Sequence, residues 1–169
     1  MTHTESTLVA AGNLQASSQR PLKTIVTAGL VAGALDITYA FIIWGLRGVS
    51  PLRIGRSVAA GLVGTEAARA GGVALGLFGL LLHFLMAIII AGIFYVAARN
   101  IRLLVKHAVP CGILFGLVTY GVMNYVVLPL SAIHSIGDSG PAYIRITGVL
   151  VHMFLIGLPI ALITRRGLR

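Results

Sequence analysis

The fold is decided by residues 73–98, which read VALGLFGLLLHFLMAIIIAGIFYVAA. This stretch contains no Asp, Glu, Lys or Arg. As an α-helix it would extend about 39 Å, since each residue adds about 1.5 Å. The hydrocarbon core of a bilayer is about 30 Å thick. The stretch therefore predicts a helix that crosses a membrane.

Three further apolar stretches have comparable length, at residues 22–46, 108–130 and 146–164. Of the 169 residues, 57% are hydrophobic and 10% are charged, whereas about a quarter are charged in soluble domains. We predict an all-α polytopic membrane protein with a single four-span bundle over residues 21–169. Residues 1–20 are polar and lack the features of a signal or transit peptide, so we predict a disordered cytoplasmic tail there.

The net charge of +9 comes from cations at the ends of the apolar stretches. They are not interleaved with aromatic residues, so we predict no nucleic-acid partner. Lys and Arg beside membrane spans are retained in the cytoplasm. Five cations fall on one side of the bundle and eight on the other, namely Arg20, Lys23, Arg99, Arg102, Lys106, Arg165, Arg166 and Arg169. This distribution predicts that both termini are cytoplasmic.

The connection over residues 48–72 has helix signals of its own. Ser50 is a suitable N-cap, and Pro51 suits the first helical position. We predict a short amphipathic helix at the outer membrane interface, in the first extracytoplasmic loop. Its Arg53 and Arg56 can reach lipid phosphates. A lid or gate is the functional alternative for this helix.

No motif of a soluble enzyme is present. The chain has no phosphate-binding loop, no dinucleotide fingerprint and no zinc-ligand spacing. Residues 137–141, GDSGP, partly resemble a trypsin-type nucleophile sequence, but turn-forming residues explain them fully. Cys111 is the only cysteine, which excludes an intrachain disulfide. We predict that the protein is not an enzyme and has no metal site.

Glycines share a face with polar residues in every span when residues are placed at 100° per step. Asp36, His83, Thr119 and His152 lie on these faces, and Met123 continues the face of the third span. Small residues mark contacts between helices in lipid. The predicted packing positions are Gly29, Gly33, Gly76, Gly79, Gly112, Gly116 and Gly148.

Four polar side chains lie near the middle of the spans and form the candidate ligand or proton site: Asp36, His83, His152 and Asn124. Asn124 is turned by about 80° from Gly116 around its helix. A carboxylate near the bilayer centre costs about 2.5–3.5 kcal/mol, and no Lys or Arg lies at the depth of Asp36. Asp36 must therefore be protonated, bonded to histidine, or in contact with water. These four polar residues have two alternative roles: they form structural contacts between helices, or they form a functional site.

The two halves of the bundle show a short internal similarity. Gly29 and Gly33 open the first span as Gly112 and Gly116 open the third, and LLHFL at residues 81–85 is similar to LVHMF at residues 150–154. Spans one and three cross in the same direction. The similarity therefore predicts two parallel hairpins related by an axis along the membrane normal.

Several short stretches support a resemblance to a known group: GLVAGALDITY at residues 29–39, GVSPLR at residues 48–53, MNY at residues 123–125 and VHMF at residues 151–154. With them, residues 22–166 resemble small four-span inner-membrane proteins of bacteria, including the YagU-type membrane proteins. The likeness lies in the span layout and the last-span histidine. It implies a bacterial inner membrane and brings no catalytic residues with it.

We therefore predict a non-enzymatic membrane protein, either a component of a larger assembly or a bundle that binds a small ligand or a proton. Its predicted partners are the lipid bilayer and further membrane subunits, including copies of itself. One alternative is a redox module in which His83 and His152 ligate a b-type haem. Another is a transporter or channel that acts as an oligomer. The sequence specifies no cofactor.

Overall fold

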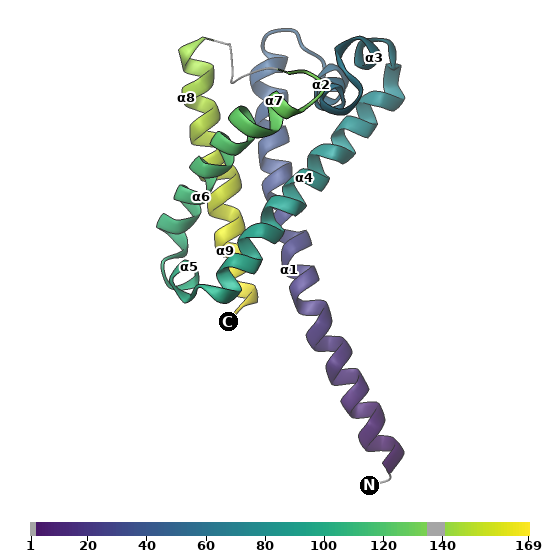
Figure 1. Ribbon diagram of the computed structural model, residues 1–169, viewed down its shortest axis with the longest axis vertical. Helices are drawn as coiled ribbons and strands as arrows, with labels where there is room; N and C mark the ends of the chain where they lie inside the picture. Colours follow the sequence, from purple (N-terminus) through teal and green to yellow (C-terminus); the bar gives the residue numbers. More distant parts are fainter. Residues whose placement is uncertain (1–2, 135–140) are drawn as a thin grey trace.

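The computed structural model describes residues 3–134 and 141–169, with side chains from Pro21 onward (Figure 1). This part of the chain contains helices and no strand. Four segments in it are long and apolar enough to cross a membrane, namely Pro21–Gly45, Gly72–Asn100, Ala108–Leu130 and Ala142–Gly167. The predicted all-α, four-helix fold is confirmed.

The first two spans are continuous helices, whereas the last two contain π-helical turns. The first span belongs to α1 (His3–Gly45), and the second is α4 (Gly72–Asn100). The third consists of α6 (Ala108–Val122), the π-helical η1 (Met123–Val127) and α7 (Leu128–Leu130). The fourth consists of α8 (Ala142–Val151), the π-helical η2 (His152–Gly157) and α9 (Leu158–Gly167).

Both π-helical turns precede a proline, Pro129 or Pro159. Proline has no backbone N–H, and its ring collides with the carbonyl group four residues earlier. A wider turn relieves that collision. Single π-turns of this kind are frequent at functional sites.

The short helices lie at opposite ends of the bundle. Helix α5 (Arg102–Lys106) joins the second and third spans near the C-terminus, and we call this the α5 end (Figure 1). Helices α2 (Pro51–Val63) and α3 (Thr65–Ala70) lie at the other end, which we call the α2 end.

Helix α2 begins as the sequence predicts. The hydroxyl oxygen of Ser50 accepts a hydrogen bond from the backbone N–H of Arg53 at 3.3 Å, and Pro51 is the first helical residue. The helix packs against α4 through a buried face. That face consists of Ile54, Gly55, Ala59 and Ala60.

Two element boundaries differ from the sequence-based expectation. Helix α1 begins at His3, within the segment that we predicted to be a disordered tail; residues 1–2 lie outside the described part. Extending an existing helix costs less than nucleating one, and no proline precedes Pro21. Helix α8 begins at Ala142, before the predicted start of the fourth span at residue 146, and therefore includes Arg145. The expected turn at residues 137–141 lies outside the described residues, apart from Pro141.

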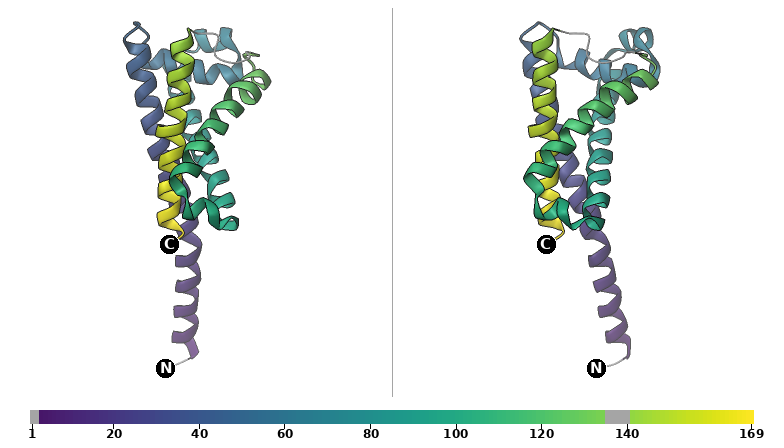
Figure 2. Two further views of the ribbon diagram at one scale, coloured as in Figure 1. Left: turned by 90° about the vertical axis from the view of Figure 1, so that its left-hand side faces the viewer. Right: turned by 60° about the vertical axis from the view of Figure 1, so that its left-hand side comes forward.

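The fourth span lies between the first and the third. Helix α1 packs against α4 and against η2 and α9, and α6 packs against the same part of the fourth span (Figure 2, left). The buried core between them is rich in alanine because small side chains let helix backbones approach in lipid. It consists of Ala28, Ala32, Ala91, Phe94, Ala98, Ala108, Ile156, Ile160 and Ala161.

The glycines of the first and third spans lie where each span meets its following span. A Cβ atom on Gly29 would lie 2.5 Å from Cα of Ile88, and one on Gly33 would lie 2.9 Å from Cδ1 of Phe84. A Cβ atom on Gly116 would overlap the backbone carbonyl oxygen of His152. In each hairpin a GxxxG pair therefore packs against the span that carries the histidine.

The remaining predicted packing glycines also lie at contacts between helices. A Cβ atom on Gly112 would lie 2.7 Å from Cβ of Ala161, and one on Gly148 would lie 3.2 Å from the ring of Tyr120. The nearest neighbours of Gly76 and Gly79 lie outside the other spans. Both glycines meet α2, because a Cβ atom on Gly79 would overlap the carbonyl oxygen of Gly55.

Candidate functional site

A cavity of about 60 Å³ lies between the spans, and residues from all four spans line it. Three of the four predicted polar site residues are among them: Asp36 from α1, His83 from α4 and His152 from η2. The other lining residues are Gly33, Met86, Ala87, Ile90, Met123 and Ile156. We call this the central cavity.

His83 is held by the backbone of the first span. Its Nε2 lies 2.9 Å from the carbonyl oxygen of Gly33. A carbonyl oxygen can only accept, so Nε2 carries the proton in this bond. The approach depends on Gly33, because a side chain there would meet the ring of Phe84 beside the histidine. The bond orients the imidazole and leaves Nδ1 as the nitrogen without a proton in the neutral ring.

Asp36 lies next to this bond. Its Oδ2 is 3.9 Å from Nε2 of His83, and the two side chains are 22% and 15% exposed. The central cavity is lined by no Lys or Arg, so histidine supplies its only basic side chains. A negative charge on Asp36 is therefore balanced within the cavity only when a histidine is protonated.

His152 is held by its own helix and by the third span. Its Nδ1 lies 2.9 Å from the carbonyl oxygen of Gly148, so Nδ1 carries the proton and Nε2 remains the titratable nitrogen. The ring of Tyr120 meets the imidazole edge-on at 5.3 Å between ring centroids. His152 is also the first residue of η2, so the widened turn starts at the cavity.

Asn124 is not part of the central cavity. Its side-chain amide donates to the carbonyl oxygen of Tyr120 at 2.9 Å, within the same helix. Met123 lines the cavity in its place. The sequence could have indicated Met123, because Met123 shares a helix face with Gly116 and Thr119. Asn124 is turned away from that face. The structure therefore brings Asp36, His83 and His152 to the central cavity, and Asn124 lies outside its lining.

The central cavity does not fit a haem. Pockets for organic ligands occupy about 300–1,000 Å³, several times its volume of about 60 Å³. In addition, Nε2 of His83 is engaged by Gly33. Within the described part of the chain, no group of three or more His, Cys, Asp or Glu side chains could hold a metal ion. The volume instead suits water molecules, which occupy about 30 Å³ each.

The fold and the central cavity define a class: an α-helical, multi-pass membrane protein with ionisable side chains between its spans. A comparison with protein-family models gave no match, and comparisons with curated proteins and with solved structures gave no significant match.

Proposed function

We propose that this chain is a non-enzymatic protein of a bacterial inner membrane whose central cavity binds a proton. The observation that carries the proposal is the meeting of Asp36, His83 and His152, from three different spans, at one small cavity. Ionisable residues inside membrane spans are costly, and they commonly serve in proton relays and ion sites.

The arrangement favours a proton over a larger ligand. Asp36 and His83 lie 3.9 Å apart, so one proton can reside on the carboxylate or on the imidazole while the pair stays neutral overall. A second proton would charge the pair, and the imidazole of His152 lines the same cavity. The surrounding lining is apolar apart from these residues, which strengthens electrostatic interactions within the cavity.

We expect a protonated carboxyl group that depends on Asp36. The full chain in lipid nanodiscs should give an infrared C=O stretching band of a protonated carboxyl group, and Asp36→Asn should remove it. His83→Gln should change the frequency of the band, because the neighbouring imidazole is lost. Asn124→Leu is the matched control and should leave the band unchanged. A band of equal intensity in the wild type and in Asp36→Asn would contradict the proposal.

Liposomes containing the protein distinguish binding from transport. A proton-binding centre without a pathway gives no change in an internal pH dye after a pH jump. A transporter or channel gives a change that Asp36→Asn abolishes. We expect the first result, because the central cavity has a volume of only about 60 Å³, too small for a continuous water-filled passage across the bundle.

We also propose that both termini lie in the cytoplasm, as the eight flanking cations on that side indicate. Thiols can be introduced at both ends of the bundle after Cys111→Ala. Ser139→Cys should react with a membrane-impermeant maleimide in intact spheroplasts. Leu103→Cys, an exposed position in α5, should react only after permeabilisation. The opposite labelling pattern would show an inverted topology.

A further inference from the structure

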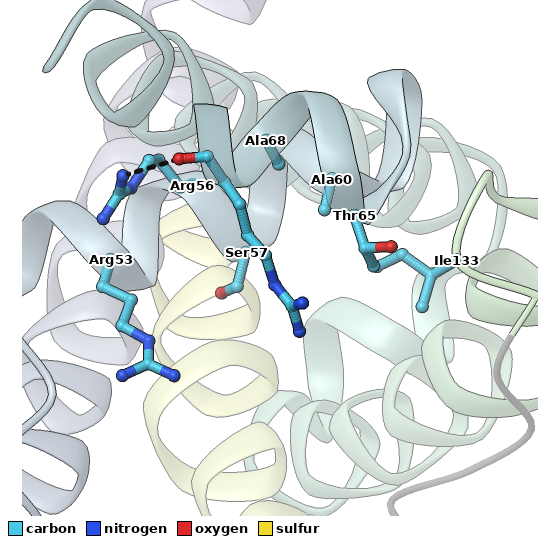
Figure 3. A pocket seen from close by; sticks show the side chains of 8 residues that line it. Arg53, Arg56, Ser57, Ala60, Thr65, Ala68 and Ile133 are labelled. Carbon is cyan, nitrogen blue, oxygen red and sulfur yellow. Dashed lines mark hydrogen bonds between the residues drawn. The ribbon is translucent and has the colours of Figure 1, made fainter. Parts of the chain in front are cut away.

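A second and larger cavity lies at the α2 end of the bundle (Figure 3). Its volume is about 470 Å³, within the range of about 300–1,000 Å³ that small-molecule sites occupy. We call it the arginine pocket. Its lining residues are Arg53, Arg56, Ser57, Ala60, Thr65, Ala68, Arg69 and Ile133.

Three arginines from two helices line this pocket without an acidic residue among them. Nη1 of Arg56 donates a hydrogen bond to the backbone carbonyl oxygen of Arg69 at 3.2 Å. This bond does not involve the guanidinium group of Arg69. Nε of Arg56 is buried and has no hydrogen-bond partner within the described part of the chain. Within the same described part of the chain, none of the three arginines forms an ion pair. Positive charge therefore gathers in the pocket with its donors incompletely satisfied.

Another arginine at the α2 end provides a contrast. Arg47 lies over the rings of Trp44 and Tyr143, at 5.0 and 5.2 Å from their centroids, and donates to the Tyr143 hydroxyl. Its guanidinium is thus used in contacts within the protein. The arginines of the pocket lack aromatic partners of this kind in the described structure.

The position of α2 sets the depth of the pocket. Gly55 of α2 is in backbone contact with Gly76 and Gly79 of α4. Gly79 lies about 10 Å along the helix from Gly72, where α4 begins. Helix α2 therefore packs beside the first two turns of the second span, at one end of the membrane-spanning bundle.

We propose that the arginine pocket binds a phosphate ester. The planar guanidinium presents paired N–H donors that match two phosphate oxygens, and several such groups together bind a doubly or singly charged phosphate. Figure 3 shows Arg53 and Arg56 on one side of the pocket and Thr65 and Ile133 on the other.

The remaining lining residues suit the rest of such a ligand. Ser57 donates its hydroxyl proton to the carbonyl oxygen of Ile54 at 2.7 Å, so Thr65 is the hydroxyl donor that remains available. Ala60, Ala68 and Ile133 supply an apolar wall for the carbon part of the ester. The phosphate can belong to the headgroup of an anionic lipid or to a soluble phosphate ester.

The test uses the full chain in an uncharged detergent and measures affinity for three probes. Short-chain phosphatidylglycerol represents the lipid source, glycerol 3-phosphate represents the soluble source, and short-chain phosphatidylcholine is the zwitterionic reference. We expect phosphatidylglycerol or glycerol 3-phosphate to bind more tightly than phosphatidylcholine. Arg56→Gln and Arg69→Gln should each weaken that binding about tenfold, the effect of losing a charge-assisted hydrogen bond.

Arg145→Gln is the matched control, because Arg145 is exposed in α8 at the same end and does not line the pocket. It removes the same charge and should change affinity less than twofold. Thr65→Glu provides a second test of the pocket if an arginine variant unfolds. Thr65 is exposed, so the bundle should remain folded while the new carboxylate prevents anion binding.

The identity of the tighter probe assigns the source of the phosphate. Affinity that falls equally in Arg56→Gln, Arg69→Gln and Arg145→Gln would overturn the proposal, since it would reflect net charge alone. Unchanged affinity in Thr65→Glu would overturn it as well. Neither result depends on the central cavity, so this proposal and that of proton binding can fail separately.

Discussion

Replacing Gly116 with leucine should unfold the bundle or destabilise it strongly. Even a Cβ atom at this position would overlap the backbone carbonyl oxygen of His152 and would lie 2.6 Å from Cα of Met153. Backbone atoms cannot rotate away as a side chain can, so α6 and the fourth span would have to separate. Overpacking of a core costs about 1–3 kcal/mol, and the total stability of a protein is about 5–15 kcal/mol. For Gly116→Leu we expect the free energy of unfolding to fall by about 3 kcal/mol or more.

Three further variants show whether the loss comes from the contact. Gly121→Leu makes the same change in the same helix, but no atom lies within 4 Å of a Cβ atom there. Gly33→Leu should have an intermediate effect, because its nearest neighbour is the ring of Phe84, which can move. Ile42→Leu should be nearly neutral, since Ile42 is 59% exposed. Equal losses of thermal stability from Gly116→Leu and Gly121→Leu would contradict the observed packing.

Asp36 and His83 should stabilise the bundle as a pair and not independently. Removing either partner leaves the other without its counterpart in a cavity that contains no Lys or Arg. In a double-mutant cycle, Asp36→Ala and His83→Ala should therefore show a coupling energy of about 0.5–3 kcal/mol. His152→Ala should couple to the same pair more weakly, because its hydrogen bond is to Gly148 of its own helix.

The control for this cycle pairs Asp36→Ala with Asn124→Ala. Asn124 bonds to the carbonyl oxygen of Tyr120 and does not line the cavity, so the two losses should add. Unfolding in a graded denaturing detergent measures all variants under the same conditions. Additive losses from Asp36→Ala and His83→Ala would remove the case for one shared polar centre.

The internal similarity of the two hairpins helps to explain this centre. In each hairpin the GxxxG pair lies against the segment that carries the histidine, at Gly33 with Phe84 and at Gly116 with Met153. The histidines differ in their partners, because His83 bonds to the other helix and His152 to its own. The two hairpins thus supply chemically different imidazoles to one cavity.

Local and periodic features of this protein were determined by its sequence alone. The spans follow from apolar runs that match the bilayer thickness, and the start of α2 follows from Ser50 and Pro51. The inward position of Asp36, His83 and His152 follows from helical periodicity, since 100° per residue assigns each side chain to a face. Each of these properties depends on residues that are close together in the chain.

Only the tertiary structure decided which faces meet and how much space remains between them. Periodicity placed Gly76 and Gly79 on an interior face, but the helix that fills that face is α2 and not another span. Met123 and not Asn124 lines the central cavity. The small volume of that cavity and the arginine pocket that Ile133 completes depend on approaches between segments far apart in sequence. A face can be assigned from one helix, whereas a contact or a cavity requires the positions of at least two.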